Sequence, residues 1–124
     1  MGELKYELSL PWPNKTLSPN ARPHWATKAR AVKVAKEVAY YLCRQKLSKP
    51  IPWPRVRLEW AFHPKTAHTL DLDNCIASAK AYQDGISLAI GIDDSLFDAD
   101  YRIAEPIKGG LVRITLSKPE FTPL

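Results

Sequence analysis

The stretch Arg55-Val56-Arg57-Leu58-Glu59-Trp60-Ala61-Phe62 decides the fold class, because large apolar residues alternate in it with polar ones. A period of two is typical of a strand with one buried face, so the even-numbered positions are predicted to face the core. Lys5–Leu10 alternates in the same way and predicts a second strand. Pro11-Trp12-Pro13 is expected to end that strand, since proline cannot donate to a strand ladder.

Two helices are predicted around this central strand. Residues 25–46 are rich in Ala, Lys, Val and Glu and hold no Pro or Gly, so Trp25–Lys46 is predicted to be a helix. The second helix is predicted to begin at Asp71 or Asp73 and to run to about Ala89, with Gly91 at its end. The buried face of the first helix is predicted to include Val34, Val38, Tyr41 and Leu42.

Two further strands complete the predicted sheet. Phe97–Ala104 and Leu111–Leu116 are expected to form a hairpin through Lys108-Gly109-Gly110, because glycines favour tight hairpin turns. The order β-α-β-α-β-β predicts an α+β fold, with one mixed sheet and two helices packed against it in two layers. The 124 residues fit one domain, 1–124.

Composition restricts the setting in which the protein works. No stretch approaches ~20 consecutive apolar residues, so no transmembrane helix and no membrane partner are expected. Cys43 and Cys75 have neither disulfide nor metal-site spacing and are expected to be buried free thiols. Free thiols are typical of a reducing compartment, so a cytoplasmic location is predicted.

The net charge of +5 is unevenly distributed along the chain. Residues 15–57 hold eleven Lys/Arg and one acid, whereas residues 71–105 hold eight acids against two cations. One interpretation of this uneven charge is a nuclease, which needs one surface that neutralises phosphates and another that binds metal. An ordinary solvated surface with uneven charge is the other, and charge alone does not separate them.

The acids fall into two pairs, Asp71 with Asp73 in Leu70-Asp71-Leu72-Asp73-Asn74, and Asp93 with Asp94 in Gly91-Ile92-Asp93-Asp94. Converging carboxylates suit Mg²⁺, which prefers oxygen ligands, and Mg²⁺ suits phosphodiester hydrolysis. Each acid also has a structural interpretation, as a helix N-cap or as turn chemistry. Asp71 and Asp73 cannot both be the cap residue, which favours the metal interpretation for the set.

Four segments together resemble the RusA family of Holliday junction resolvases. They are Leu-Pro-Trp-Pro at 10–13, Asp-Leu-Asp-Asn at 71–74, Gln-Asp-Gly-Ile at 83–86 and Gly-Ile-Asp-Asp at 91–94. The similarity runs from about Tyr6 to Leu116. It implies a homodimer, often of phage or prophage origin, that acts in DNA recombination and repair.

The resemblance also implies an activity and a site. The activity is Mg²⁺-dependent cutting of four-way DNA junctions, with Mn²⁺ as an expected substitute. The essential aspartates of the family fall on Asp71, Asp73 and Asp94, and we expect Asp93 to support the metal.

One position departs from the family pattern. Members of the family can carry a lysine four residues after the second aspartate, where this chain has Ala77. Lys80 lies on the same predicted helix face, one turn away, and is our candidate for the missing catalytic charge. The alternative is a solvated surface lysine paired with Asp84.

The DNA-binding surface is predicted around the start of the first helix. The predicted contacts are Asn20, Arg22, His24, Lys28, Lys33 and Lys65. Trp12 and Trp25 are either base-stacking residues or core residues. His63 and His68 fit a zinc site, a phosphate contact or a plain loop, and these three interpretations stay open.

Chain length constrains how the three aspartates meet. A straight helix from Asp73 to Ala89 carries the chain about 25 Å. The five residues from there to Asp94 span at most about 17 Å. Either the helix ends early near Gln83-Asp84-Gly85, which the glycine slightly favours, or Asp94 comes from the partner subunit.

The leading functional hypothesis is therefore a dimeric junction resolvase. A structure-selective nuclease acting on flaps or replication forks is a close alternative, because dimer geometry determines the shape of the substrate. A junction-binding protein without catalysis is another alternative, which the lysine missing at position 77 suggests. An adaptor with acidic loops would leave the basic helix unexplained.

Overall fold

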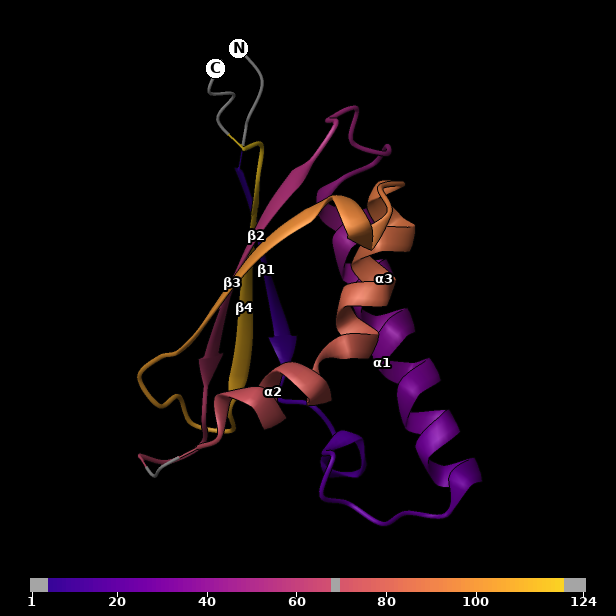
Figure 1. The fold of residues 1–124 in the computed structure, drawn as a ribbon. Coiled ribbons are helices and arrows are strands. Elements are labelled where there is room, and N and C mark those ends of the chain that lie inside the picture. Colours follow the sequence, from indigo (N-terminus) through magenta and orange to yellow (C-terminus); the bar gives the residue numbers. More distant parts are fainter. Residues whose placement is uncertain (1–4, 68–69, 120–124) are drawn as a thin grey trace.

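The computed structural model describes residues 5–67 and 70–119, which form a four-stranded sheet with its helices on one face (Figure 1). The strands are β1 (Lys5–Pro11), β2 (Val56–His63), β3 (Phe97–Ile103) and β4 (Leu111–Ser117). The helices are α1 (Trp25–Lys46), α2 (Leu72–Ser78) and α3 (Lys80–Ile90), with 3₁₀ turns η1 (Lys15–Leu17) and η2 (Asp94–Leu96). The predicted α+β class with a two-layer arrangement and a mixed sheet is confirmed.

The strand order β1-β4-β2-β3 differs from the predicted hairpin, because β2 lies between β3 and β4. β3 runs parallel to β2, and β4 is antiparallel to both β1 and β2. Gly109 and Gly110 do turn the chain, with φ of 82° and 77°. The connection is fastened across the end of β2 by hydrogen bonds from the Ala104 and Ile107 amides to the Phe62 and Pro64 carbonyls. This crossing places β4 on the far side of β2.

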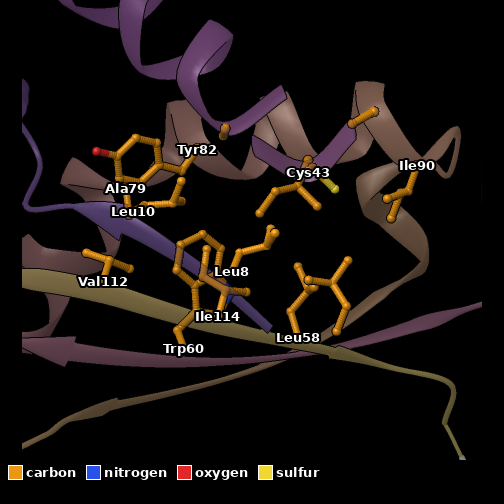
Figure 2. Close-up of a cluster of buried hydrophobic side chains, with 14 of the residues drawn as sticks. Leu8, Leu10, Cys43, Leu58, Trp60, Ala79, Tyr82, Ile90, Val112 and Ile114 are labelled. Atoms are coloured by element: carbon orange, nitrogen blue, oxygen red, sulfur yellow. The ribbon is translucent and has the colours of Figure 1, made fainter. Parts of the chain in front are cut away.

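The core lies between the sheet and the helices, as the alternation in β2 predicts. All four even-numbered β2 residues from Val56 to Phe62 are buried, with the inward residues of β1 and β4 beside them. Figure 2 shows Leu58 and Trp60 of β2 on the side of the sheet that faces Cys43 of α1 and Tyr82 and Ile90 of α3. Cys43 and Cys75 are buried free thiols, as predicted.

The buried face of α1 differs from the prediction. Its buried residues are Ala35, Ala39 and Cys43, whereas Val34 and Tyr41 are 57% and 62% exposed. The reason is that α1 packs closely on α3, where small residues are needed. A Cβ atom added to Gly85 would lie 2.3 Å from the Lys36 carbonyl oxygen, so the two helix backbones approach more closely there than any side chain permits.

The second predicted helix is divided at Ala79, which has φ −98° and ψ 4°. The chain bends there and continues as α3 through Gly85 to Ile90, so the predicted early end at Gly85 is wrong. Gly85 serves helix packing instead. The prediction of one helix carrying both Ala77 and Lys80 is also wrong, because Ala77 is in α2 and Lys80 begins α3. The predicted end at Gly91 is confirmed, since Gly91 has a left-handed φ of 73° that glycine adopts without strain.

Within residues 5–67 and 70–119, no helix combines the length and the apolar character needed to cross a membrane.

Candidate functional site

Asp71 is the N-cap of α2. Its Oδ1 accepts hydrogen bonds from the backbone amides of Asp73 (2.9 Å) and Asn74 (3.3 Å). The structural interpretation of Asp71 therefore holds, although the cap uses only one of the two carboxylate oxygens. Asp73 lies in the first turn of α2 and is exposed. The local sequence thus presents two carboxylates at one helix start, and only Asp71 is needed to cap it.

The second acidic pair begins η2. Asp93 caps this turn, with its Oδ2 accepting from the Ser95 amide at 3.0 Å, and hydrogen bonds from the Ser95 side chain and the Ser95 amide lower the pKa of the Asp93 carboxyl. Asp94 is the first residue of the turn and is half-buried. Turn chemistry accounts for Asp93, whereas the Asp94 side chain is directed to a cation on α3.

Lys80, the first residue of α3, is that cation. Its Nζ donates to Asp84 Oδ1 at 2.8 Å and to Asp94 Oδ2 at 3.1 Å. The hydrogen bond that Lys80 donates to Asp84 is the largest influence that raises the pKa of the Lys80 ammonium, and Asp94 adds to it. The predicted surface pair between Lys80 and Asp84 is therefore present. The sequence does not predict the contact between Lys80 and Asp94, because that contact depends on how η2 folds back along α3.

The three predicted essential aspartates do not form one cluster within a single chain. The described residues contain no group of three or more His, Cys, Asp or Glu side chains arranged to hold a metal. Asp71 and Asp73 lie together at the start of α2, while Asp94 is tied to Lys80 on α3. The two carboxylates at α2 still fit Mg²⁺ chemically, because this ion often takes one or two protein carboxylates and completes its shell with water and phosphate.

A cavity of about 270 Å³ brings two distant segments of the sequence together. Trp12, Pro13 and Asn14 line it from the segment after β1, and Asp71 and Asn74 line it from the start of α2. The Trp12 ring packs edge-to-face on Phe62, with centroids 6.4 Å apart, so Trp12 is a packing residue. Trp12 and Pro13 thus form a wall beside the acidic start of α2. The sequence predicted only that this segment ends β1.

A second contact holds this segment against α3. The Tyr82 hydroxyl donates to the Pro11 carbonyl at 2.7 Å. Burial raises the pKa of the Tyr82 phenol to about 12, so this donor keeps its proton at neutral pH. Sequence reasoning missed Tyr82, because only the packing of α3 over the end of β1 reveals its partner.

The predicted DNA contacts lie in three places. Asn20 and Arg22 are in the loop before α1, and Lys65 follows β2 on the wall of a shallow depression of about 730 Å³. His24 caps α1, with its Nδ1 accepting from the Ala26 amide at 3.2 Å. Lys28 and Lys33 are exposed on α1, as predicted.

The separation of the sequence into a basic and an acidic half is only partly a separation in space. Arg55 is hydrogen-bonded to Asp98 at 2.9 Å, and Arg57 pairs with Asp100 on the sheet face that carries no helix. Because β2 and β3 are neighbours, these two acids pair with the cations at the end of the basic half. Sequence counts alone could not reveal this, since it depends on strand pairing.

His63 is the last residue of β2 and only 1% exposed, with Nδ1 2.7 Å from the Glu105 carbonyl oxygen. None of its three interpretations holds for His63: neither zinc ligation with other acidic or His ligands nor surface phosphate contact fits this burial, and the residue belongs to β2 rather than to a loop. His68 lies outside the described residues.

Comparisons with known proteins add one relationship. The chain matches no family model. It is 42% identical over 115 residues to a protein of Xylella fastidiosa (strain Temecula1) whose name is "Uncharacterized protein", and the match covers 89% of this chain and 74% of that protein. This extent of identity includes nearly the whole sheet and helix framework, so the chain belongs to the same family as the Xylella fastidiosa protein.

Proposed function

We propose that this protein is a Mg²⁺-dependent endonuclease of the RusA type that cuts four-way DNA junctions. The observation that supports it most is the contact between Lys80 and Asp94. These residues are 14 positions apart; the family resemblance implies that Asp94 is essential, and Lys80 is the candidate for the catalytic charge that is missing at Ala77. A lysine whose ammonium group is held in place by Asp84 and Asp94 suits stabilisation of a charged phosphate.

The roles follow from the chemistry of each side chain. Asp71 and Asp73 would hold Mg²⁺, which supplies an activated water and stabilises the departing oxygen when bound. Lys80 would balance charge at the scissile phosphate, and Asp94 would orient Lys80 or join the metal site. The exposed cations of α1 would contact the phosphates of the DNA arms, which makes binding strongly salt-dependent.

We further propose that a homodimer completes the site, because two symmetric cuts suit a two-fold axis. Two observations support this arrangement. The described part of one chain does not gather Asp94 with Asp71 and Asp73. In addition, α1 exposes an apolar stripe of Val34 and Tyr41 with half-buried Val38 between them, which offers a contact for a second copy.

A synthetic four-way junction tests the proposed function directly. We expect paired nicks at symmetric positions with Mg²⁺, and none with EDTA. A duplex of the same sequence is the control and should stay intact. Tight junction binding without cutting would replace the nuclease with a binding protein, and much faster cutting of flaps or forks would reassign the substrate.

The contact of Lys80 gives a second prediction. Lys80→Ala should lower the cutting rate at saturating junction by about 10- to 100-fold, since a charge that acts on the transition state affects the rate more than binding. The double change Ala77→Lys with Lys80→Ala should recover part of this loss, because the new lysine restores the charge pattern of the family.

Asp84→Asn is the matched control for Lys80, because it removes the surface pair and keeps the lysine. Rates and junction affinities of the three variants are measured in parallel. A normal rate for Lys80→Ala would show that its contacts with Asp84 and Asp94 are only a surface charge pair.

A further inference from the structure

Trp25 is exposed to a degree that the fold does not explain. Its exposed fraction is 76%, the largest among the exposed large apolar side chains in the described part of the chain. Trp12 and Trp60, by contrast, pack against Phe62. An indole left in solvent contributes nothing to the core, and exposed aromatic residues mark interaction sites when they are grouped with other binding groups.

Trp25 has such a group beside it. The rings of His24 and Trp25 lie 5.5 Å apart between centroids and are tilted by 34°. The hydrogen bond from the Ala26 amide to His24 Nδ1 fixes the His24 ring, and a neutral His24 then carries its proton on Nε2. We call these two rings the aromatic platform. It lies where α1 begins, at a corner of the molecule away from the sheet (Figure 1).

The charge around the platform identifies the kind of partner. Residues 15–36 hold six Lys/Arg and no acid. None of these six cations forms an ion pair within residues 5–67 and 70–119. Arg22 precedes the platform, and Lys28 lies one turn after Trp25 on the same helix. Flat rings among unpaired cations are complementary to a polyanion that has flat rings of its own, which describes nucleic acid.

We propose that the aromatic platform stacks on an unpaired DNA base, whose flanking phosphates contact Arg22 and Lys28. A base inside a duplex is already stacked on both faces, so the platform can take only a base that is free of its neighbour. The inference deepens the proposed function and rests on it for the choice of DNA. In this proposal Trp25, which has no part in the proposed cutting chemistry, recognises DNA strands that carry an unpaired base.

The test measures stacking without cutting. The full chain is titrated, in EDTA, against a short single-stranded oligonucleotide with one 2-aminopurine, and base fluorescence reports stacking. Trp25→Leu should weaken binding between about 5-fold and about 100-fold and change the fluorescence response, because leucine keeps an apolar side chain but cannot stack. Trp25→Phe should stay close to the parent protein, since it keeps an aromatic face.

Leu88→Ala is the control, because Leu88 is 62% exposed but lies on α3 outside the basic segment. It should bind as the parent does. Equal binding by Trp25→Leu and the parent would overturn the inference. So would weaker binding accompanied by a smaller species in sedimentation, which would show that Trp25 joins two copies of the chain. If the parent protein stacks the base but does not cut junctions, the inference about Trp25 would hold and the proposed nuclease activity would be wrong.

Discussion

Asp71→Asn, Asp73→Asn and Asp94→Asn are each expected to lower junction cutting by more than about 100-fold and to leave junction binding intact. Removing a residue that only supports a metal ligand typically costs 10- to 100-fold, so removing a ligand should cost at least about the upper value. Asparagine keeps the shape of the side chain but brings no negative charge to Mg²⁺. The measurement is the single-turnover cutting rate beside a binding titration in EDTA.

The choice of asparagine matters most at Asp71. Because Asp71 caps α2, an alanine there would also destabilise the helix, whereas asparagine is as good a cap as aspartate. A lost rate in Asp71→Asn with an unchanged unfolding midpoint therefore separates the metal role from the cap. Asp93→Asn is the control and should have a milder effect. A near-normal rate in any of the three variants would remove that residue from the proposed site.

The same inactive variants test whether the site is shared between subunits. Asp73→Asn and Asp94→Asn proteins are mixed and allowed to exchange subunits. Cutting should return at one site of each heterodimer if Asp94 acts with the Asp73 of its partner. Mixtures that stay inactive would mean that each chain uses its own three aspartates, and that η2 moves toward α2 when DNA or metal binds.

Gly85→Ala is expected to lower the free energy of unfolding by about 3 kcal/mol, at the upper end of the cost of overpacking. The new Cβ would lie 2.3 Å from the Lys36 carbonyl oxygen and 3.0 Å from Ala39 Cβ, so α1 and α3 must separate. Urea unfolding followed by circular dichroism measures the change.

Leu88→Ala on the same helix is the control for this substitution. Its side chain is exposed, so the change should stay within about 0.5 kcal/mol. A Gly85→Ala protein as stable as the parent would show that the two helices do not pack at this distance and that Gly85 is not needed for their packing.

What the sequence predicted well depended on local patterns. Alternation in β2 identified the core face, and the composition of residues 25–46 gave the bounds of α1. The position of Gly91 gave the end of α3. Each of these signals is contained within one element, where hydrophobic period and backbone preference act directly.

The errors share a different cause, which is packing between distant segments. Gly109 and Gly110 predicted a turn correctly, but the connection crosses β2 because its own amides donate to backbone carbonyls in β2 and just after it. Gly85 was predicted to end the helix because the residues next to it in the sequence do not indicate its close contact with α1. For the site, the resemblance to the RusA family indicated the aspartates, whereas the attachment of Asp94 to Lys80 required the fold.

The position of β4 has a consequence for how the chain folds as it is synthesised. Among the strands that the structure describes, β1 pairs with β4 alone, with Lys5 opposite Ser117. Of these strands, β1 is synthesised before the others and cannot pair until β4 has been made, while one edge of β2 also stays open. Pairings between such distant residues close slowly, and open strand edges invite association with other chains. Synthesis of β4 is thus the step that joins β1 to the rest of the sheet.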